Sequence, residues 1–266
     1  MDKRTQLDDS YSLSKEQITR FREDGHILLR NVIRKEEVNK IRQSFLRTSE
    51  DWERLNNSNN ELDNVKSYLG PVNLRNINKD IYKFLASYRF AKIASQLLGV
   101  PSLRIFRDFL VVRNPGDQNT PWHQDRQDPI LDTNKLITMW MPLVDLPQES
   151  GTLNFITGTH KLYEKGKNTT QALMTASRKK YNIVDYGNLQ AGDATFHAAG
   201  TIHSAKPNNS TVTRESVSVT YFADGAKINT HINEKSSLFE EMQYFFPGHR
   251  LGEEPKITQY PIIYTE

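Results

Sequence analysis

A histidine and an aspartate two positions apart, His123 and Asp125, constrain most strongly how this chain of 266 residues can fold. Side chains at i and i+2 lie on the same face of an extended strand, so this pair can bind one metal ion. A second histidine far along the chain, His203, can supply a third ligand from a distant strand. Two imidazoles and one carboxylate on one side of a metal form the facial triad of non-haem Fe(II) oxygenases, which leaves coordination positions open.

Arg214 follows His203 after a turn rich in proline, asparagine and serine. If a hairpin turns between Asn208 and Asn209, Arg214 lies opposite His203, with Cβ atoms roughly 5 Å apart. A guanidinium in that place can hold the far carboxylate of a 2-oxo acid through two hydrogen bonds. A register error of one residue would turn Arg214 to the other face of its strand, so this geometry is a hypothesis.

Several segments of the chain resemble the phytanoyl-CoA dioxygenase family. They are PWHQD at 121–125, GTLNFITGTHK at 151–161, GDATFH at 192–197, the spacing from His203 to Arg214, residues 13–17 and 24–26 near the start, and 246–248 with 261–264 near the end. The likeness covers nearly the whole chain. It implies an oxygenase that uses Fe(II), 2-oxoglutarate and O2 to oxidise a small molecule, on a double-stranded β-helix fold.

The resemblance also assigns the catalytic metal ligands. It implies that His123, Asp125 and His203 bind iron and that Arg214 binds 2-oxoglutarate. Family halogenases lack the carboxylate ligand, so the presence of Asp125 favours hydroxylation. Desaturation, epimerisation and ring formation depend on how the substrate lies and stay open.

Further residues of the predicted strands are expected to contact 2-oxoglutarate. Thr138 and Trp140 are two apart and share a face of the strand predicted at 136–143, which in the family contributes cosubstrate contacts; the alternative for Trp140 is a place in the core. A hydroxyl residue often stands two places after the distal histidine in the family, where this chain has Ala205. Ser204 and Ser216 are the candidates to replace its hydrogen bond.

His197 is the alternative third ligand, because it lies on a predicted strand after the turn at 191–193. Its position in the family favours a neighbouring role. The remaining histidines have no partner at ligand spacing and are predicted to be surface or packing residues: His26, His160, His231 and His249.

The periodicity predicts an α+β chain with helices first and a jelly-roll, cupin-like barrel after them. Ser14 and Gln17 form a capping box that opens a helix ending at Glu23, before a strand at 26–30. Two sets of apolar residues at helical spacing predict helices packed on the sheet: Val38, Ile41 and Phe45, and then Ile81, Phe84, Leu85 and Tyr88.

Alternating apolar residues bounded by turn residues predict strands at 103–112, 136–143, 152–156, 194–197, 201–205 and 212–222. The polar, lysine-rich segment 164–181 is predicted to be a mobile loop near the mouth of the site. The aromatic residues within 236–264 are predicted to pack over the barrel.

Composition agrees with one enzyme domain spanning 1–266, since 36% hydrophobic residues can bury a substantial core. The absence of cysteine excludes disulfides, thiolate metal sites and cysteine nucleophiles. A net charge of +3, with scattered basic residues, gives no nucleic-acid surface. No apolar run is long enough to span a membrane and the first ten residues are polar, so we expect a cytoplasmic protein acting on a small molecule.

Two other classes of protein are compatible with the same sequence features. One is a non-oxidative metalloenzyme on a cupin-like barrel, using Zn(II) or Mn(II) with the same three ligands and another task for Arg214. The other is a catalytically silent relative that keeps the fold for binding.

Overall fold

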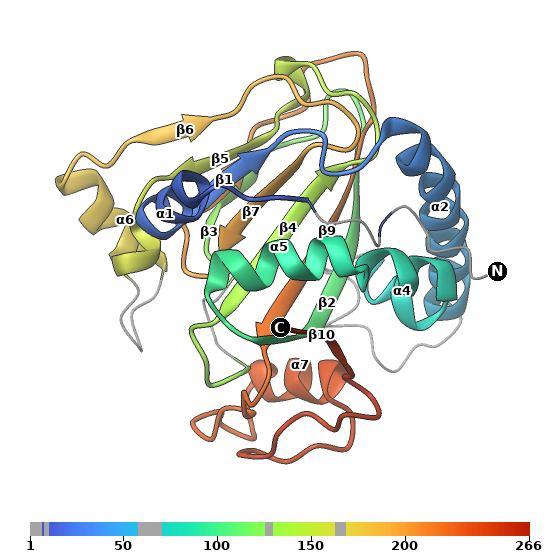
Figure 1. Ribbon diagram of the computed structural model, residues 1–266, viewed down its shortest axis with the longest axis vertical. Coiled ribbons are helices and arrows are strands. Elements are labelled where there is room, and N and C mark those ends of the chain that lie inside the picture. The colour runs from blue at the N-terminus through green and yellow to red at the C-terminus, as the bar shows by residue number, and fades with distance from the viewer. Residues whose placement is uncertain (1–6, 8–10, 58–70, 126–129, 163–168) are drawn as a thin grey trace.

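Two antiparallel sheets form the centre of the molecule in the computed structural model, which describes residues 7, 11–57, 71–125, 130–162 and 169–266 (Figure 1). The major sheet has the order β1 (His26–Leu29), β7 (Ala194–Ala198), β4 (Leu136–Pro142), β9 (Arg214–Ala223), β2 (Ser102–Arg113) and β10 (Ile262–Thr265). The minor sheet has the order β3 (Thr120–His123), β8 (His203–Ala205), β5 (Leu153–Ile156) and β6 (Ile183–Asp185). The expected combination of helices with antiparallel sheets is therefore confirmed, whereas the strand pairing gives two separate sheets and does not confirm the expected barrel.

The helices lie mainly before the strands in sequence, as predicted. They are α1 (Lys15–Asp24), α2 (Lys35–Asn57), α4 (Lys79–Leu85), α5 (Tyr88–Leu98), α6 (Thr169–Arg178) and α7 (Ser237–Phe245), with short 3-10 helices η2 (Leu74–Asn76), η3 (Gln148–Ser150) and η4 (Thr159–Leu162). Within the described parts of the chain, no helix is both long and apolar enough to cross a membrane.

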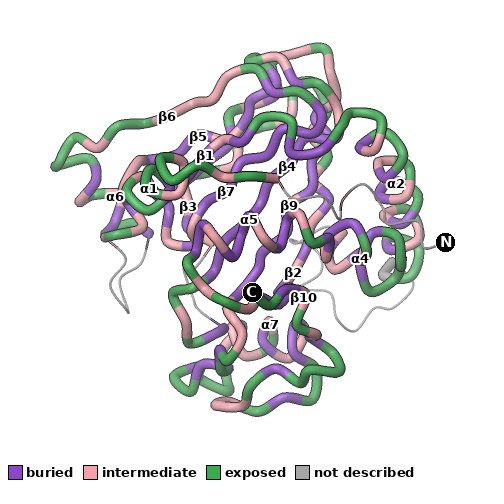
Figure 2. Tube along the Cα trace, viewed as in Figure 1, coloured by how far each residue is buried: buried purple, intermediate pink, exposed green. Residues whose placement is uncertain are grey.

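The major sheet is covered on both faces, which explains why β4 is buried along its whole length (Figure 2). Alternate side chains of a strand point to opposite faces. Ile137, Met139 and Met141 therefore join the hydrophobic core with residues of α5, which crosses this face (Figure 1). Thr138 and Trp140 point the other way, into a cavity between the two sheets.

The capping box at the start of α1 is present as predicted. Ser14 Oγ accepts a hydrogen bond from the Gln17 backbone N–H, and the Gln17 side chain accepts one from the Ser14 N–H. Gly25 ends the helix in the left-handed region at φ 81°, which glycine adopts without steric cost. The chain then enters β1 directly.

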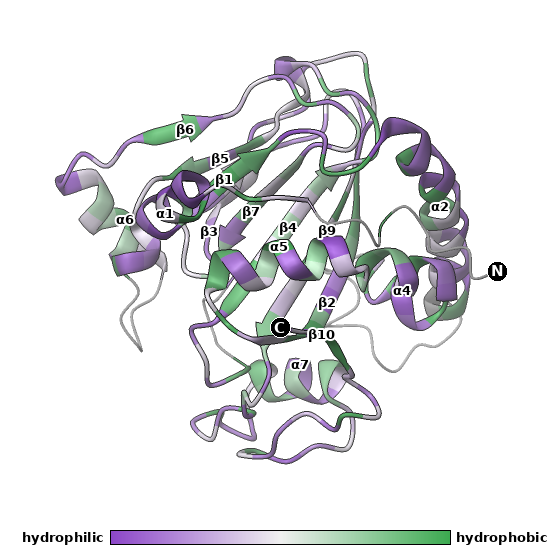
Figure 3. Ribbon diagram, viewed as in Figure 1, coloured by the Kyte–Doolittle hydropathy of each residue, from purple (hydrophilic) through white to green (hydrophobic). Residues whose placement is uncertain are grey.

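The apolar spacing at 38–45 forms one face of α2, where Val38, Ile41 and Phe45 are buried in a helix that is otherwise mostly hydrophilic (Figure 3). The apolar residues between positions 81 and 88 do not lie on a single helix. The chain leaves helical geometry at Ser87, and Tyr88 begins α5 with its side chain largely exposed.

The expected loop at 164–181 is wrong where the structure describes it, because residues 169–178 form α6. Ala172 and Ala176 are four apart and pack on Ile156 and Ile202, so a short apolar face fixes the helix among polar residues. Residues 164–168 lie outside the described part of the chain.

The C-terminal aromatic segment packs against the major sheet as expected. Met242 and Phe245 of α7 and the following Phe246 are buried, and the Phe246 ring stacks on Phe106 of β2 with ring centroids 5.3 Å apart. This segment therefore closes one end of the sheet (Figure 1).

Candidate metal centre

One group of side chains that could hold a metal ion occurs in the described parts of the chain, and it consists of His123, Asp125 and His203. Their ligand atoms all lie within 4.8 Å of one another. His123 ends β3 and faces His203 directly across the antiparallel pair with β8, with ring centroids 4.1 Å apart. Asp125 lies in the turn just after β3, so the strand predicted to carry both residues ends before the carboxylate.

The predicted hairpin between His203 and Arg214 is wrong. The chain crosses from the minor sheet to the major sheet between them, and Arg214 pairs with Arg113 of β2. The side-chain amide of the buried Asn208 holds this crossing, since it donates to the carbonyls of Arg113 and Val212. Arg214 therefore reaches the same cavity as His203 from the opposite sheet.

Both histidine ligands are oriented by backbone carbonyls. His123 Nδ1 lies 2.8 Å from the Pro121 carbonyl, and His203 Nδ1 lies 3.0 Å from the Thr201 carbonyl. A carbonyl only accepts hydrogen bonds, so each Nδ1 carries the proton and each neutral ring presents a free Nε2 lone pair. This is the arrangement in which outer hydrogen bonds fix histidine ligands for a metal.

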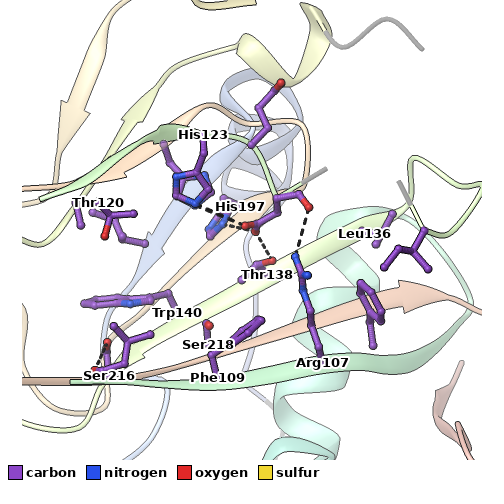
Figure 4. A pocket seen from close by; sticks show the side chains of 18 of the residues that line it. Arg107, Phe109, Thr120, His123, Leu136, Thr138, Trp140, His197, Ser216 and Ser218 are labelled. Atoms are coloured by element: carbon purple, nitrogen blue, oxygen red, sulfur yellow. Dashed lines mark hydrogen bonds and ion pairs between the residues drawn. The ribbon is translucent and has the colours of Figure 1, made fainter. Parts of the chain in front are cut away.

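The two oxygens of Asp125 have different neighbours. Oδ1 lies 4.0 Å from His123 Nε2 and 3.8 Å from His203 Nε2, so it belongs to the three-atom donor set. Oδ2 accepts hydrogen bonds from Thr138 Oγ1 at 2.7 Å and His197 Nε2 at 3.0 Å (Figure 4). His197 thus presents its Nε2 to the carboxylate, and the donor set includes His203 instead.

Burial and neighbouring groups keep these ligands ready for a cation. Burial, with His197 close by, lowers the pKa of His203 to about 3, so the ring is neutral at neutral pH. Burial alone would raise the pKa of Asp125, but His203 and the hydrogen bond from His197 outweigh it and hold that pKa well below its usual range. Two imidazoles and one carboxylate fit a divalent metal ion.

Arg214 is buried at one end of the cavity. Its Nη1 donates to the backbone carbonyls of Ser150 and Gly151, whereas its Nε has no hydrogen-bond partner among the described residues. Burial, together with the adjacent Arg113, lowers the pKa of Arg214 to about 10, so the group stays cationic. The guanidinium is anchored at one nitrogen and keeps an unsatisfied donor for an anion.

The hydrogen bond from Arg214 to the carbonyl of residue 151 requires a glycine at that position. Its φ is 75°, and a Cβ atom would collide with the carbonyls of Lys206 and Pro207. The backbone carbonyl of Gly151 can therefore approach both the chain crossing and Arg214. Asp193, in the next motif, is structural: it is buried and accepts hydrogen bonds from Arg30 and from the backbone of Asn31.

The cavity that contains the triad has a volume of about 530 Å³. The predicted contacts Thr138, Trp140 and Ser216 line it, as does Ala205, whereas Ser204 faces a separate cavity on the other side of β8. Cosubstrate roles for these residues stay predictions. Of the other histidines, His26 and His249 are buried packing residues, His160 is partly buried and His231 is exposed.

Sequence reasoning missed several lining residues, namely Arg107, Phe109, Thr120, Ser218 and Glu241. The first four are labelled in Figure 4. Alternation on β9 could have found Ser218, because it shares a strand face with Arg214 and Ser216. Arg107 could not be found in this way, because a bulge in β2 interrupts the alternation between Ile105 and Arg107.

Fold and site together define a mononuclear non-haem metal oxygenase. A sequence model of the phytanoyl-CoA dioxygenase (PhyH) family matches residues 21–216. The chain belongs to this family, as its sequence motifs indicated, and it is an enzyme of the dioxygenase class.

Solved structures share the fold over almost the whole chain. The non-haem α-ketoglutarate-dependent carbocyclase SnoK from nogalamycin biosynthesis has a TM-score of 0.74 at 20% identity, covering 94% of this chain and 96% of that chain. The epimerase SnoN, in complex with Fe3+, α-ketoglutarate and nogalamycin RO, has a TM-score of 0.73 at 23% identity, covering 94% and 98%. EctD from S. alaskensis, with 2-oxoglutarate and 5-hydroxyectoine, has a TM-score of 0.69 at 17% identity, covering 95% and 91%. No curated protein matches the chain by sequence.

Proposed function

We propose that this protein is an Fe(II)- and 2-oxoglutarate-dependent dioxygenase that hydroxylates a C–H bond of a small-molecule metabolite. The observation that carries the proposal is the facial donor set of His123, Asp125 and His203 beside a cavity that also contains Arg214. Family membership and the three structural neighbours support it. A zinc or manganese enzyme without oxidative chemistry would not need the buried guanidinium of Arg214 to bind a cosubstrate.

We also propose that the molecule has a double-stranded β-helix fold. The two sheets are the two halves of a double-stranded β-helix, with the metal centre between them. One hydrophobic cluster extends from Phe21 to Tyr264, which supports a single domain over 1–266. We also propose a cytoplasmic location, because Fe(II) persists in a reducing compartment.

In the proposed reaction, His123 Nε2, His203 Nε2 and Asp125 Oδ1 would hold the metal. Bound Fe(II) with 2-oxoglutarate and O2 supplies the oxidising power, and oxidative decarboxylation of the cosubstrate releases succinate and CO2. The carbonyls of Pro121 and Thr201 keep both rings in the ligating tautomer.

Arg214 binds the far carboxylate of 2-oxoglutarate in this proposal. It offers an unpaired Nε in a buried place, where a charge-assisted hydrogen bond is strong. Trp140 and Phe109 line the cavity in the same region and exclude water from the cosubstrate (Figure 4). Asp125 occupies its ligand position with a carboxylate, which leaves no place for a halide and favours hydroxylation.

An anaerobic titration tests the proposal. Protein with stoichiometric Fe(II) is titrated with 2-oxoglutarate, and a weak visible metal-to-ligand charge-transfer band is expected in wild type but not in Asp125→Ala. Succinate release in air with candidate metabolites then measures turnover. A chain that binds Fe(II) but gives neither the band nor succinate is a non-oxidative or silent relative.

A further inference from the structure

The cavity has two ends along the major sheet. Arg214, Ser216 and Ser218 line the cavity from alternate positions of β9, and Thr220 continues the same alternation, so about 20 Å of extended strand separates Arg214 from Thr220. Thr220 pairs with Arg107 of β2. Arg107 therefore lies at the opposite end from Arg214, beside the metal centre, since its Nη2 lies 3.4 Å from the backbone carbonyl of Asp125.

A β-bulge turns Arg107 into the cavity. Ile105 pairs with Tyr221 and Arg107 pairs with Thr220, so Phe106 is the extra residue. Without a bulge, Arg107 would share the face of Leu103 and Ile105, which are core residues. Bulges of this kind re-aim side chains next to functional sites.

The guanidinium of Arg107 is desolvated and incompletely satisfied. Its side chain is 13% exposed, and its carbon lies 5.0, 5.3 and 5.6 Å from the ring centroids of Phe106, Phe109 and Phe245. Nε has no hydrogen-bond partner among the described residues. Its Nη1 forms an ion pair with Glu241 Oε1 at 3.4 Å, and its Nη2 lies 3.4 Å from the backbone carbonyl of Asp125; both distances exceed the usual length of a hydrogen bond.

The surroundings of Arg107 indicate the ligand that would satisfy it. Ile130, Leu131 and Leu136 line the same region with Phe106, which fits an apolar body. Glu241 contributes a negative charge nearby, and this disfavours polyanions such as phosphate esters. A single carboxylate on a carbon-rich molecule matches both features.

We propose that Arg107 binds the substrate through a carboxylate, and that the substrate is a small amphipathic carboxylic acid. This rests on the proposed function, in which 2-oxoglutarate occupies the end of the cavity toward Arg214. Because Arg107 contacts the backbone of Asp125, the bound carboxylate lies close to the metal. The oxidised carbon is therefore within a few bonds of the carboxylate.

Matched pairs of acid and amide test this inference. Octanoate, 3-phenylpropanoate and N-acetyl-leucinate are each compared with their primary amides by anaerobic calorimetric titration of protein loaded with Fe(II) and 2-oxoglutarate. We expect at least one acid to bind tenfold or more tightly than its amide, because charge-assisted hydrogen bonds to a guanidinium distinguish them. If no acid binds at millimolar concentration, or if acids and amides bind alike, the inference is wrong.

Variants separate recognition from a structural role. Arg107→Gln should remove the preference for the acid, Arg107→Lys should keep part of it, and Glu241→Gln should tighten acid binding by removing a nearby negative charge. Arg20→Gln, on the exposed face of α1, is the charge-matched control. An Arg107→Gln variant that keeps the preference, or one that weakens Fe(II) binding as much as acid binding, overturns the proposal.

The two proposals fail in different ways. The charge-transfer band is measured first with 2-oxoglutarate, and its half-saturation should be the same in Arg107→Gln and wild type. If wild type gives no band, the proposed function fails, and the comparison of acids with amides is repeated on the metal-free chain. That comparison alone then decides whether Arg107 binds a carboxylate.

Discussion

Thr138 Oγ1 lies 2.7 Å from Asp125 Oδ2 and donates a hydrogen bond to the oxygen outside the three-atom donor set. Thr220 Oγ1 lies 3.0 Å from Thr138 Oγ1. Because the Thr138 proton is already used, Thr220 is the donor in that second contact. A short chain of hydroxyls across β9 and β4 thus fixes which carboxylate oxygen faces the metal.

Replacing Thr138 with valine should lower metal affinity by about tenfold to a hundredfold, because the variant keeps the shape but loses the hydrogen bond that orients Asp125. Thr138→Ser, which keeps the hydroxyl, should bind metal like wild type. Anaerobic Fe(II) titration measures both. Equal affinity in wild type and Thr138→Val would show that Asp125 is held without this contact.

His123→Ala, Asp125→Ala and His203→Ala should each abolish binding of stoichiometric Fe(II), because two protein ligands are too few. His197→Ala should still bind Fe(II), because His197 contacts the carboxylate and not the donor set. Metal content after gel filtration gives the answer. If His197→Ala loses the metal while His203→Ala keeps it, the third ligand is His197.

Arg214→Lys should raise the half-saturating concentration of 2-oxoglutarate by about tenfold or more, because lysine keeps the charge but loses the planar fork. Fe(II) affinity should change little. Titration of the charge-transfer band compares the variant with wild type, and Arg20→Lys serves as the surface control. Unchanged half-saturation in Arg214→Lys and in Arg214→Ala would remove this residue from cosubstrate binding.

His26 should make the folded state sensitive to acid. Its ring stacks on Phe155 and contacts the hydroxyls of Tyr186 and Thr157, and burial lowers its pKa to about 4 from the ordinary 6.5. The unfolded chain therefore binds a proton first as the pH falls, and stability is lost from about pH 6.5 down to about pH 4, by about 3 kcal/mol at most.

Urea unfolding of the metal-free protein at several pH values in that range tests the role of His26. The free energy of unfolding should fall less steeply with acid in His26→Gln than in wild type. The comparison uses slopes, so a constant loss of stability in the variant does not matter. Parallel curves would show that His26 does not titrate in this way.

Truncation after Asp224 should give insoluble or inactive protein, because it removes α7, β10 and the rings that cover Phe106. The single change Phe246→Ala should cost about 3–5 kcal/mol of stability, since a fully buried aromatic ring is lost. Ile257→Ala is the control, because this side chain is exposed. A soluble truncated chain with normal turnover would show that the C-terminal segment is dispensable.

Much of the fold was predictable because apolar alternation and turn residues are local signals. The strand predicted at 103–112 is observed at Ser102–Arg113, and that predicted at 212–222 at Arg214–Ala223. The short strands β6 and β10 have too few alternating residues to give such a signal. Helix α6 was missed because its buried face is short and only weakly apolar, with Thr169, Ala172 and Ala176 buried.

The three side chains expected from the sequence to hold a metal do lie together in the structure, but most of the residues around them were not expected. Arg214 reaches the cavity, but spacing along the chain cannot distinguish a hairpin from a crossing between two sheets. The observed strand partners of His203 are His123 and Phe155, which are both distant in sequence. Arg107 was hidden because a one-residue bulge reverses the alternation on which such reasoning depends.

The position of the C-terminal helix α7 bears on how the substrate preference of this enzyme can evolve. The end of the cavity near Arg214 is lined mostly by strands of the two sheets, whereas the end near Arg107 also draws on Glu241 of α7 and the segment at 130–131. The two pieces of chain that line only the end near Arg107 therefore contain neither the three residues of the donor set nor Arg214. We expect that replacing residues 236–264 with the corresponding segment of a relative changes which molecule is oxidised, while the metal ligands stay the same. New activities can then evolve through exchange of this C-terminal segment.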